Sequence, residues 1–371
     1  MEFIINRDVF LKALGHANGI IEKKSALPIL SNVLIEAKDS KIKITTTDLD
    51  IIYFEEILPQ ELKKEGSTTT SASILYDILR KLQPNAKIEL SLQSLNKIKL
   101  VSENSKFNLL CLPSDNFPLS DEIINQKSFE ISSQKLLKFL NKTKISISND
   151  ETRHHLNGVY FHKTKLENKS FLCGVATDSH RLSSYSLEID PNIDIEPIIL
   201  PKKTIFQLIS LLEQSSSAIK ISNNKSIIKF EMDKCVLISK VIDGRFPDYS
   251  KVVPKSNDKI LQIKLDEFKN SIERVTAVSS DRTKGLKMKI SKDVVQLSVN
   301  NPSSGEGIEI IKAKFNSDDL NISFNSRYLM DIASQIENES IIINLKDAGS
   351  PVLINDFSDK NSYYVVMPMK I

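Results

Sequence analysis

The sequence is poor in glycine and cysteine and contains no tryptophan. Only 10 of its 371 residues are glycine, and Gly305-Glu306-Gly307 is not followed by the Lys-Ser or Lys-Thr pair of a phosphate-binding loop. The three cysteines, Cys111, Cys173 and Cys235, are far apart, which argues against a disulfide framework and against a zinc site. We therefore expect no cofactor and no bound metal.

Targeting and membrane segments are also missing. Met1–Phe10 lacks the basic stretch and the apolar stretch of a signal peptide, and no apolar run approaches the roughly 20 residues that cross a bilayer. Charged residues make up 26% and hydrophobic residues 40%, which is ordinary for a globular protein. We expect a cytoplasmic protein without a membrane partner, with two or three domains because the chain exceeds the size of one usual core.

Two patterns of apolar residues recur three times along the chain. Their first residues are Phe3, Phe129 and Leu261 for one pattern, and Leu75, Ile205 and Leu329 for the other. Because both patterns return at intervals of 124 to 132 residues, we predict a threefold repeat. The predicted domains are residues 1–126, 127–253 and 254–371. Each repeat is expected to end on one of three similar segments, Phe117-Pro118, Phe246-Pro247 and Met367-Pro368.

Each repeat is predicted to contain a strand, a helix and several short strands, and then the same series again. The predicted helices are Asn6–Ala17, Ser71–Leu82, Ser132–Ser148, Pro201–Leu212, Asp266–Val275 and Asn325–Ile336. Short alternating or β-branched runs such as Ile42–Thr46 and Ile98–Val101 lie between them. Isolated helices separated by runs of strands favour an α+β fold in which helices pack on antiparallel sheets. Linkers are expected near 120–127 and 253–259.

Positive charge is concentrated in the predicted helices. The formal net charge is only +3, but the six helical ranges together carry +7 and the rest of the chain carries −4. The range Ser132–Ser148 contains no acidic residue, and Lys135, Lys138 and Lys142 are spaced to lie on one helical face. Such a stripe is either a solvated face or a surface that contacts phosphates without reading bases.

Residues that could carry chemistry do not form a catalytic or metal-binding set. His154 and His155 are adjacent, so that in a strand their rings point to opposite faces. The sequence Thr177–His180 places Asp, Ser and His consecutively, whereas a catalytic triad draws its members from separate elements. We predict a protein that is not an enzyme.

The C-terminal run Tyr363–Ile371 is unusually apolar for a chain end. A terminal strand explains Tyr363–Val366, but proline cannot continue a strand ladder. Met367 and Met369 on either side of Pro368 are typical of an adaptable apolar surface. This pattern favours a pocket that binds peptides.

Six segments spread over the whole chain resemble the bacterial DNA polymerase III beta subunit, the replicative sliding clamp. In chain order they are Leu27-Pro28-Ile29-Leu30, Thr47-Asp48-Leu49, Arg153 with Leu156-Asn157-Gly158, Ala176-Thr177-Asp178 with His180-Arg181-Leu182, Asp243 to Tyr249, and Tyr364 to Met369. The resemblance implies three similar domains per chain and a ring-shaped homodimer of six domains. In such a ring, helices line the hole, duplex DNA passes through it, and the clamp acts as a processivity factor.

The resemblance also implies three sets of site residues. The peptide-binding pocket comprises Leu156, Thr177, His180, Arg181, Leu182, Pro247, Val252, Val365, Met367, Pro368 and Met369. The DNA-contact candidates are Lys24, Arg80, His154 and His155, to which the basic helical ranges add Lys135, Lys138, Lys142, Lys202 and Lys203. The dimer interface comprises Phe107 and Leu109 facing Ala277 and Val278.

The implied partners are double-stranded DNA, bound without sequence preference, and a second copy of the chain. Peptide partners are the DNA polymerase III catalytic subunit, the clamp-loader complex, and other polymerases and repair proteins that carry the clamp-binding motif. Two alternatives remain open from the residues alone. One is a repeat-built adaptor without DNA in its hole, and the other is a metal-dependent nuclease.

Overall fold

The computed structural model describes residues 1–22, 27–119, 128–279 and 284–370. One order of elements, a strand, a helix and then a run of strands, occurs six times along the chain. The predicted α+β class with antiparallel sheets is confirmed. Lys24 and the linker predicted at 120–127 lie outside the described residues.

The elements are grouped here by repeat. The first repeat contains β1 (Glu2–Asn6), α1 (Arg7–Asn18), β2 (Asn32–Lys38), β3 (Lys41–Thr47), β4 (Ile51–Ile57), β5 (Glu61–Lys64), β6 (Gly66–Ser71), α2 (Ala72–Lys81), β7 (Lys87–Ser94), β8 (Lys97–Ser102) and β9 (Ser105–Leu112). The second contains β10 (Phe129–Ser132), α3 (Ser133–Lys144), β11 (Gly158–Leu166), β12 (Lys169–Thr177), β13 (Arg181–Ile189), β14 (Ile198–Pro201), α4 (Lys202–Leu212), β15 (Ala218–Asn223), β16 (Ile227–Glu231) and β17 (Cys235–Lys240). The third contains β18 (Lys259–Lys264), α5 (Leu265–Val275), β19 (Gly285–Ser291), β20 (Val294–Asn301), β21 (Gly305–Lys314), β22 (Leu320–Asn325), α6 (Ser326–Ala333), β23 (Ser340–Leu345), β24 (Val352–Asp356) and β25 (Asp359–Val366).

All six predicted helices are present, and α3 is the one that differs most at its end. It stops at Lys144, four residues before the predicted end at Ser148. The backbone N–H of Ser148 donates instead to the carbonyl of Leu156 (3.1 Å). Ser148 is thus bonded outside the helix, which the apolar periodicity of the segment did not indicate.

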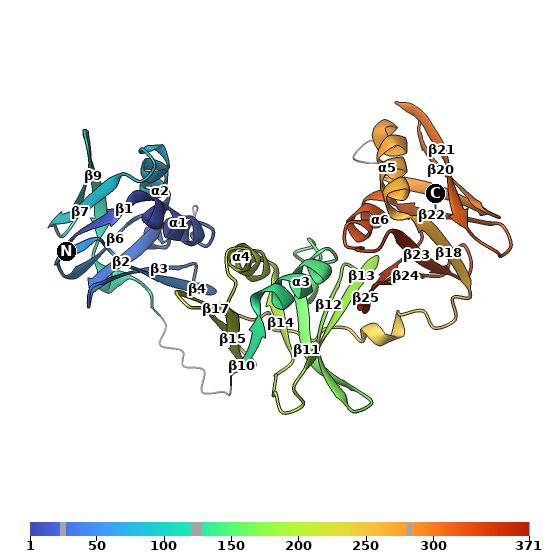
Figure 1. Cartoon of the computed structure of the whole chain (residues 1–371), viewed down its shortest axis with the longest axis horizontal. Helices are drawn as coiled ribbons and strands as arrows, with labels where there is room; N and C mark the ends of the chain where they lie inside the picture. The colour runs from blue at the N-terminus through green and yellow to red at the C-terminus, as the bar shows by residue number, and fades with distance from the viewer. Residues whose placement is uncertain (23–26, 120–127, 280–283, 371) are drawn as a thin grey trace. The chain divides into compact units, whose positions relative to one another are not determined.

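Helix α1 illustrates how the repeat builds its core. The Asn6 side chain accepts hydrogen bonds from the N–H groups of Asp8 and Val9 and so caps the helix. Phe10 then packs edge-to-face on Phe3 of β1, with ring centroids 6.2 Å apart, and both rings are fully buried. Helices α1 and α2 lie side by side on the strands of this repeat (Figure 1).

The chain forms two compact units, and each unit contains one long sheet. The first unit comprises Met1–Leu137, Asp194–Glu196 and Lys203–Val241, and its 13 strands run β10-β15-β16-β17-β4-β3-β2-β6-β9-β8-β7-β1-β5. The second comprises Lys138–Ile193, Pro197–Lys202 and Ile242–Ile371, and its 12 strands run β14-β11-β12-β13-β25-β24-β23-β18-β21-β20-β19-β22. The second repeat contributes strands to both sheets.

Two strand pairs join successive repeats within these sheets. In the first unit β17 pairs antiparallel with β4, so the first and second repeats share a sheet. In the second unit β25 pairs antiparallel with β13, which joins the second and third repeats in the same way. We call these two pairs the β4–β17 junction and the β13–β25 junction.

The predicted match of Met367-Pro368 to the other two proline segments is wrong. Met367 directly follows β25, and its N–H donates to the carbonyl of His180 (2.8 Å). Lys240, the last residue of β17, makes the corresponding bond to the carbonyl of Asp50 (2.8 Å). Met367 therefore corresponds to Lys240, which precedes Phe246 by six residues.

Candidate functional site

A tight turn between β12 and β13 carries several residues of the predicted peptide pocket. Thr177 Oγ1 accepts a hydrogen bond from the N–H of Ser179 (3.1 Å). Asp178 Oδ1 accepts from the N–H groups of His180 (2.9 Å) and Arg181 (3.0 Å). Ser179 has a φ of 77°, in the left-handed region that side chains disfavour. The two side-chain acceptors therefore stabilise a strained turn that presents His180 to solvent.

Arg181 is fixed in place by two carboxylates and an aromatic ring. Its guanidinium donates to Asp178 Oδ2 (3.1 Å) and to Asp331 Oδ2 (2.6 Å). The same group lies 4.2 Å from the centroid of the Tyr328 ring. With its side chain only 10% exposed, Arg181 helps to hold the turn against the third repeat.

A compact apolar cluster lies next to this turn. It contains Leu156, Leu182 and Val365, each at most 3% exposed, together with the buried Phe246. The ring of Tyr160 stacks on Phe246, with centroids 4.9 Å apart. The structure thus brings together three predicted pocket residues that are more than 20 residues apart in sequence.

Exposed apolar side chains surround the cluster. Val252, Met367 and Met369 are 48%, 39% and 41% exposed. The C-terminal segment is tied down by the bond from Met367 to His180 and by a second bond from the Met369 N–H to the carbonyl of Ser323 (2.7 Å). The two methionines are consequently held at a defined position while part of each side chain faces solvent.

The segment that contains Pro247 and Val252 is anchored to the same cluster. Tyr249 and Val253 pack against it beside Phe246, whereas Pro247 is exposed. Pro368, between the two methionines, is partly buried. The residues predicted for the pocket therefore lie in three places: the apolar cluster, the β12–β13 turn, and the two segments that contain Pro247 and Pro368.

The lysine stripe of α3 differs from its prediction. Lys135 is exposed, but the Lys142 side chain is only 4% exposed. Lys142 Nζ lies 3.0 Å from Glu337 Oε1 and 3.9 Å from Asp356 Oδ2, and it also donates to the carbonyl of Gln335. The prediction that Lys142 contacts DNA is wrong, because acidic groups of the third repeat enclose its ammonium group.

Lys138 is engaged by the same acidic groups. Its Nζ lies 2.9 Å from Glu337 Oε2 and 2.9 Å from Asp359 Oδ2. Burial lowers the pKa of Lys138, but the hydrogen bonds to Asp359 and Glu337 outweigh it, so the pKa is raised. We call Lys138, Lys142, Glu337, Asp356 and Asp359 the α3 charge cluster.

Arg80 and Lys203, two further residues predicted to contact DNA, each interact with an aspartate of the first repeat. Arg80 is 60% exposed and lies 3.2 Å from Asp77 on α2. Lys203 donates to Asp48 and to the carbonyl of Ile20. Each retains an exposed cationic side chain, so a phosphate contact is compatible with its position.

Three other candidates lie in the second unit. Lys202, the first residue of α4, donates to the side chain of Asn149. His154 is exposed, and His155 is partly buried. Gly244 has a φ of 152°, and a Cβ on it would come within 3.2 Å of His155 Cβ. The glycine thus lets the Asp243–Tyr249 loop approach His155.

The predicted interface residues lie near two open strand edges. Phe107 and Leu109 on β9 pack against the core of their own repeat, and Val278 packs against the core of the third. Along β9, the described pairings with β6 involve only Cys111 and Leu112. The Ser105–Leu110 part of β9 is therefore paired on one side by β8 alone.

Strand β21 has the same arrangement in the third repeat. Its described pairings with β18 involve only Ala313 and Lys314, whereas β20 pairs along its length. Ile308 and Ile310 on this strand are 56% and 65% exposed, and Leu110 on β9 is 81% exposed. Sequence reasoning missed these three residues, although alternation along each strand indicates that they face away from the core.

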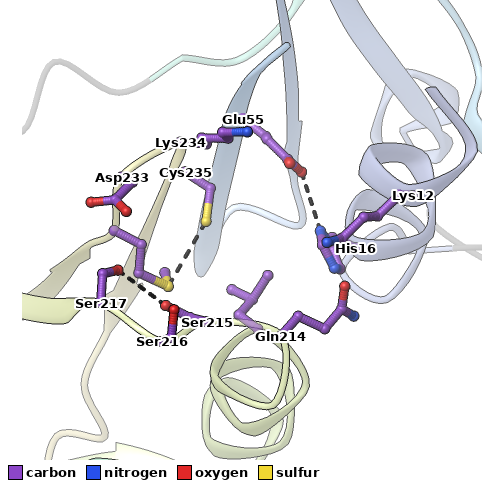
Figure 2. Close-up of a pocket in the computed structure, with 12 residues that line it drawn as sticks. Lys12, His16, Glu55, Gln214, Ser215, Ser216, Ser217, Asp233, Lys234 and Cys235 are labelled. Carbon is purple, nitrogen blue, oxygen red and sulfur yellow. Dashed lines mark hydrogen bonds and ion pairs between the residues drawn. The ribbon is translucent and has the colours of Figure 1, made fainter. Parts of the chain in front are cut away.

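A separate cavity contains the most chemically suggestive cluster in the first unit. Figure 2 shows this cavity, about 220 Å³ in volume, with His16, Glu55 and Cys235 on its wall. Tyr53 donates to Glu55 Oε2 (2.6 Å), and His16 Nδ1 lies 3.1 Å from the same oxygen. Burial and the nearby Glu55 carboxylate raise the pKa of Cys235 to about 12. A raised pKa disfavours the thiolate, which is the nucleophilic form of cysteine. The contacts of Glu55 with His16 and Tyr53 link α1 to β4.

Neither a metal-binding cluster nor a membrane-spanning helix is present among the described residues. Within them, no group of three or more His, Cys, Asp or Glu side chains is arranged to hold a metal ion. None of the helices in the described ranges combines the length and the apolar character that a membrane-spanning helix needs.

Comparisons with known proteins cover the whole chain. Residues 1–121, 130–248 and 250–370 match the N-terminal, central and C-terminal domains of the DNA polymerase III beta subunit. The beta sliding clamp of Caulobacter vibrioides is 32% identical over the full length of both chains, and that of Escherichia coli is 29% identical, also over both full lengths.

Solved structures agree over the same length. The Bartonella birtlesii DnaN sliding clamp bound to griselimycin matches with a TM-score of 0.96 and 36% identity, and all of both chains is covered. The DNA polymerase III subunit beta of Pseudomonas aeruginosa matches with a TM-score of 0.92 and 29% identity, again over all of both chains.

Proposed function

The chain belongs to the DNA polymerase III beta subunit family and is a DNA sliding clamp, and from this premise we propose that two copies close head to tail into a ring around duplex DNA. Clamps of this family are non-catalytic processivity subunits. The resemblance inferred from the sequence is confirmed at the level of family and function.

The observation that carries the ring proposal is the pair of open strand edges. Strand β9 belongs to the first repeat and β21 to the third, so the two edges differ and can pair head to tail between two chains. Pairing them buries Leu110 and the Ile308–Ile310 pair, which are otherwise largely exposed. Phe107, Leu109, Ala277 and Val278 lie next to these edges and complete the proposed interface.

We propose that the pocket at the β13–β25 junction binds short apolar peptide segments of partner proteins. The buried cluster of Leu156, Leu182 and Val365 supplies a rigid floor, and the partly exposed Met367 and Met369 supply adaptable walls. Expected ligands are segments of the DNA polymerase III catalytic subunit, the clamp-loader complex, other polymerases and repair proteins.

DNA contact is assigned to the basic residues that remain after the correction of α3, of which Lys135, Arg80, Lys203 and His154 are exposed and Lys202 is partly buried. Lys135, Arg80 and Lys203 lie on α3, α2 and α4, and Lys202 and His154 lie near the start of α4 and of β11. Exposed cations on helices attract phosphates without reading bases, as a sliding protein requires. The domain boundaries 126/127 and 253/254 and a cytoplasmic location belong to the same proposal.

Retention on DNA of different topology tests the ring. Labelled protein is loaded onto nicked circular DNA by a clamp loader and separated from free protein by gel filtration. Because the tether is topological, the protein should stay on the circle and leave within minutes once the circle is cut by a restriction enzyme. Equal loss from circular and linear DNA would contradict a closed ring and would favour the adaptor alternative.

A further inference from the structure

The turn that shapes the peptide pocket occurs a second time, in the first repeat. Thr47 Oγ1 accepts from the N–H of Leu49 (3.0 Å), as Thr177 does from Ser179. Asp48 Oδ1 accepts from the N–H groups of Asp50 (3.0 Å) and Ile51 (2.7 Å), as Asp178 does from His180 and Arg181. The two turns therefore share all three hydrogen bonds from backbone N–H groups to side-chain oxygens, whereas the bond from Thr177 Oγ1 to the carbonyl of Arg181 (2.7 Å) is found only in the second repeat.

The strands beside the two turns also correspond. At the β13–β25 junction Leu182 lies opposite Val365, and at the β4–β17 junction Ile52 lies opposite Ile238. The bond from the Lys240 N–H to the Asp50 carbonyl matches the bond from Met367 to His180. The buried Phe117, followed by Pro118, corresponds in turn to Phe246 and Pro247.

Leu49 is in a conformation and an environment that leucine usually avoids. Its φ is 79°, in the left-handed region where a β-carbon is strained, and its side chain is 43% exposed. Leu119, close by after Pro118, is 53% exposed. Backbone strain maintained at an exposed apolar residue is typical of ligand-binding positions.

A cavity of about 320 Å³ lies between these residues, within the size range of ligand pockets. Leu49, Ile52, Leu119, Ile227 and Ile238 form most of its apolar wall. The charged groups at its edge are already paired, because Lys240 Nζ lies 3.2 Å from Asp50 Oδ1 and Asp48 binds Lys203. An occupant must therefore be apolar and uncharged.

We propose that this cavity at the β4–β17 junction is a second site for a short, neutral peptide segment with aliphatic and aromatic side chains. The inference rests on the proposed peptide-binding function of the first pocket, whose turn, strand register and proline segment it repeats. Asp50 and Lys240 occupy the positions that His180 and Met367 have at the first pocket. The ion pair between Asp50 and Lys240 therefore narrows the opening of the second cavity. Binding is consequently weaker here than at the first pocket.

Methyl NMR on the full-length protein, labelled at isoleucine δ1 and methionine ε methyl groups, tests both sites in one titration. The probe is the neutral peptide acetyl-Ser-Leu-Leu-Phe-Ser-amide. Ile52, Ile227 and Ile238 report on the new site, and Met367 and Met369 report on the first pocket. We expect both groups of signals to shift and saturate, with the isoleucines requiring at least threefold more peptide.

Two variants and one control sharpen the test. Leu49→Asn removes the apolar wall but tolerates the left-handed φ, so the isoleucine shifts should be lost while the melting temperature is maintained or rises. Asp50→His combined with Lys240→Met gives the second cavity the two residues found at the opening of the first pocket. In this variant the isoleucine signals should saturate at a peptide concentration at least threefold lower. The control Leu166→Asn replaces a leucine that is 66% exposed in another hairpin. It should change neither the isoleucine shifts nor the peptide concentration at which they saturate.

The outcomes separate this inference from the proposed function. If the methionine signals shift and the isoleucine signals stay fixed up to 5 mM peptide, the second site is overturned and the first pocket stands. Isoleucine shifts that persist in Leu49→Asn also overturn the second site. If only the isoleucines shift, and Leu49→Asn abolishes the shift, the second site stands and the assignment of the first pocket fails.

Discussion

Lys142 of α3 is buried against Glu337, with Nζ 3.0 Å from Oε1, although the two residues are 195 positions apart. The lysine stripe of α3 is thus neutralised largely within the chain, by acids of the third repeat. Of the three lysines spaced on that face, only Lys135 remains an exposed candidate for DNA contact. The two engaged lysines instead help to fix the second repeat to the third.

Reversing the charge of Lys142 should therefore destabilise the protein. In Lys142→Glu, a buried carboxylate faces Glu337 and Asp356, and removal of one partner from a buried ion pair costs roughly 3 kcal/mol or more. The matched control is Lys135→Glu on the same helix, which should change the unfolding free energy by no more than about 0.5 kcal/mol. Urea denaturation of both variants measures the difference, and equal stability would contradict the burial of Lys142.

The α3 charge cluster should also give the protein a specific sensitivity to acid. Burial raises the pKa of Glu337, but the hydrogen bonds from Lys138 and Lys142 outweigh it and hold that pKa below its ordinary value of 4.5. A carboxylate with a lowered folded pKa stabilises the fold above its unfolded pKa, and this contribution is lost as pH falls through the folded value.

We therefore expect the unfolding free energy to fall between pH 5 and pH 3, and to fall less in Lys142→Met, because the charge that lowers the pKa has been removed. Denaturation at pH 6, 5, 4 and 3.5 measures the slope, with Lys135→Met as the control. Parallel slopes in Lys142→Met and the unsubstituted protein would show that Lys142 does not couple to these carboxylates.

Charges on the open edge of β21 should prevent dimer formation. Ile308→Glu combined with Ile310→Glu places two carboxylates where the edge of a second chain is proposed to pair, and desolvating them is unfavourable. Sedimentation across micromolar concentrations should give a monomer that keeps its melting temperature. Leu166→Glu, on an equally exposed leucine outside the proposed interface, should remain a dimer. A dimer in the double variant would place the interface elsewhere.

Shortening the two methionines should weaken the first pocket without unfolding it. Met367→Ala with Met369→Ala keeps the two backbone bonds of the C-terminal segment, and a fully buried methionine side chain contributes about 1.5–3 kcal/mol. Since each is already about 40% exposed in the free protein, folding should change little. Fluorescence anisotropy with a polymerase-derived peptide should show at least a tenfold loss of affinity, and an unchanged affinity would contradict the proposed walls.

The helices and the repeat were predictable because their signal is local. Phe3, Phe10 and Leu14 are spaced so that the first strand and helix bury one face, and the structure buries all three. The family could likewise be predicted from short motifs, such as Thr177–Arg181, which forms the turn stabilised by side-chain hydrogen bonds. Each of these features depends on residues a few positions apart.

Features that depend on distant partners were not predictable. The spacing of Lys142 correctly placed it on a face of α3, but no local pattern indicates that Glu337 and Asp356 enclose its ammonium group. Similarly, Met367 was matched to the wrong residues because its equivalence to Lys240 follows from strand register across a junction. Ile308 and Ile310 were missed because an open edge is a property of the sheet.

The two junctions inside the chain resemble contacts between separate subunits. At β4–β17 and at β13–β25, neighbouring repeats meet through strand pairing, the kind of contact that also joins separate chains. Each junction therefore has the form of a subunit boundary that lies within one polypeptide. The cavity beside Leu49 and the proposed peptide pocket beside Met367 lie at equivalent places of these two boundaries.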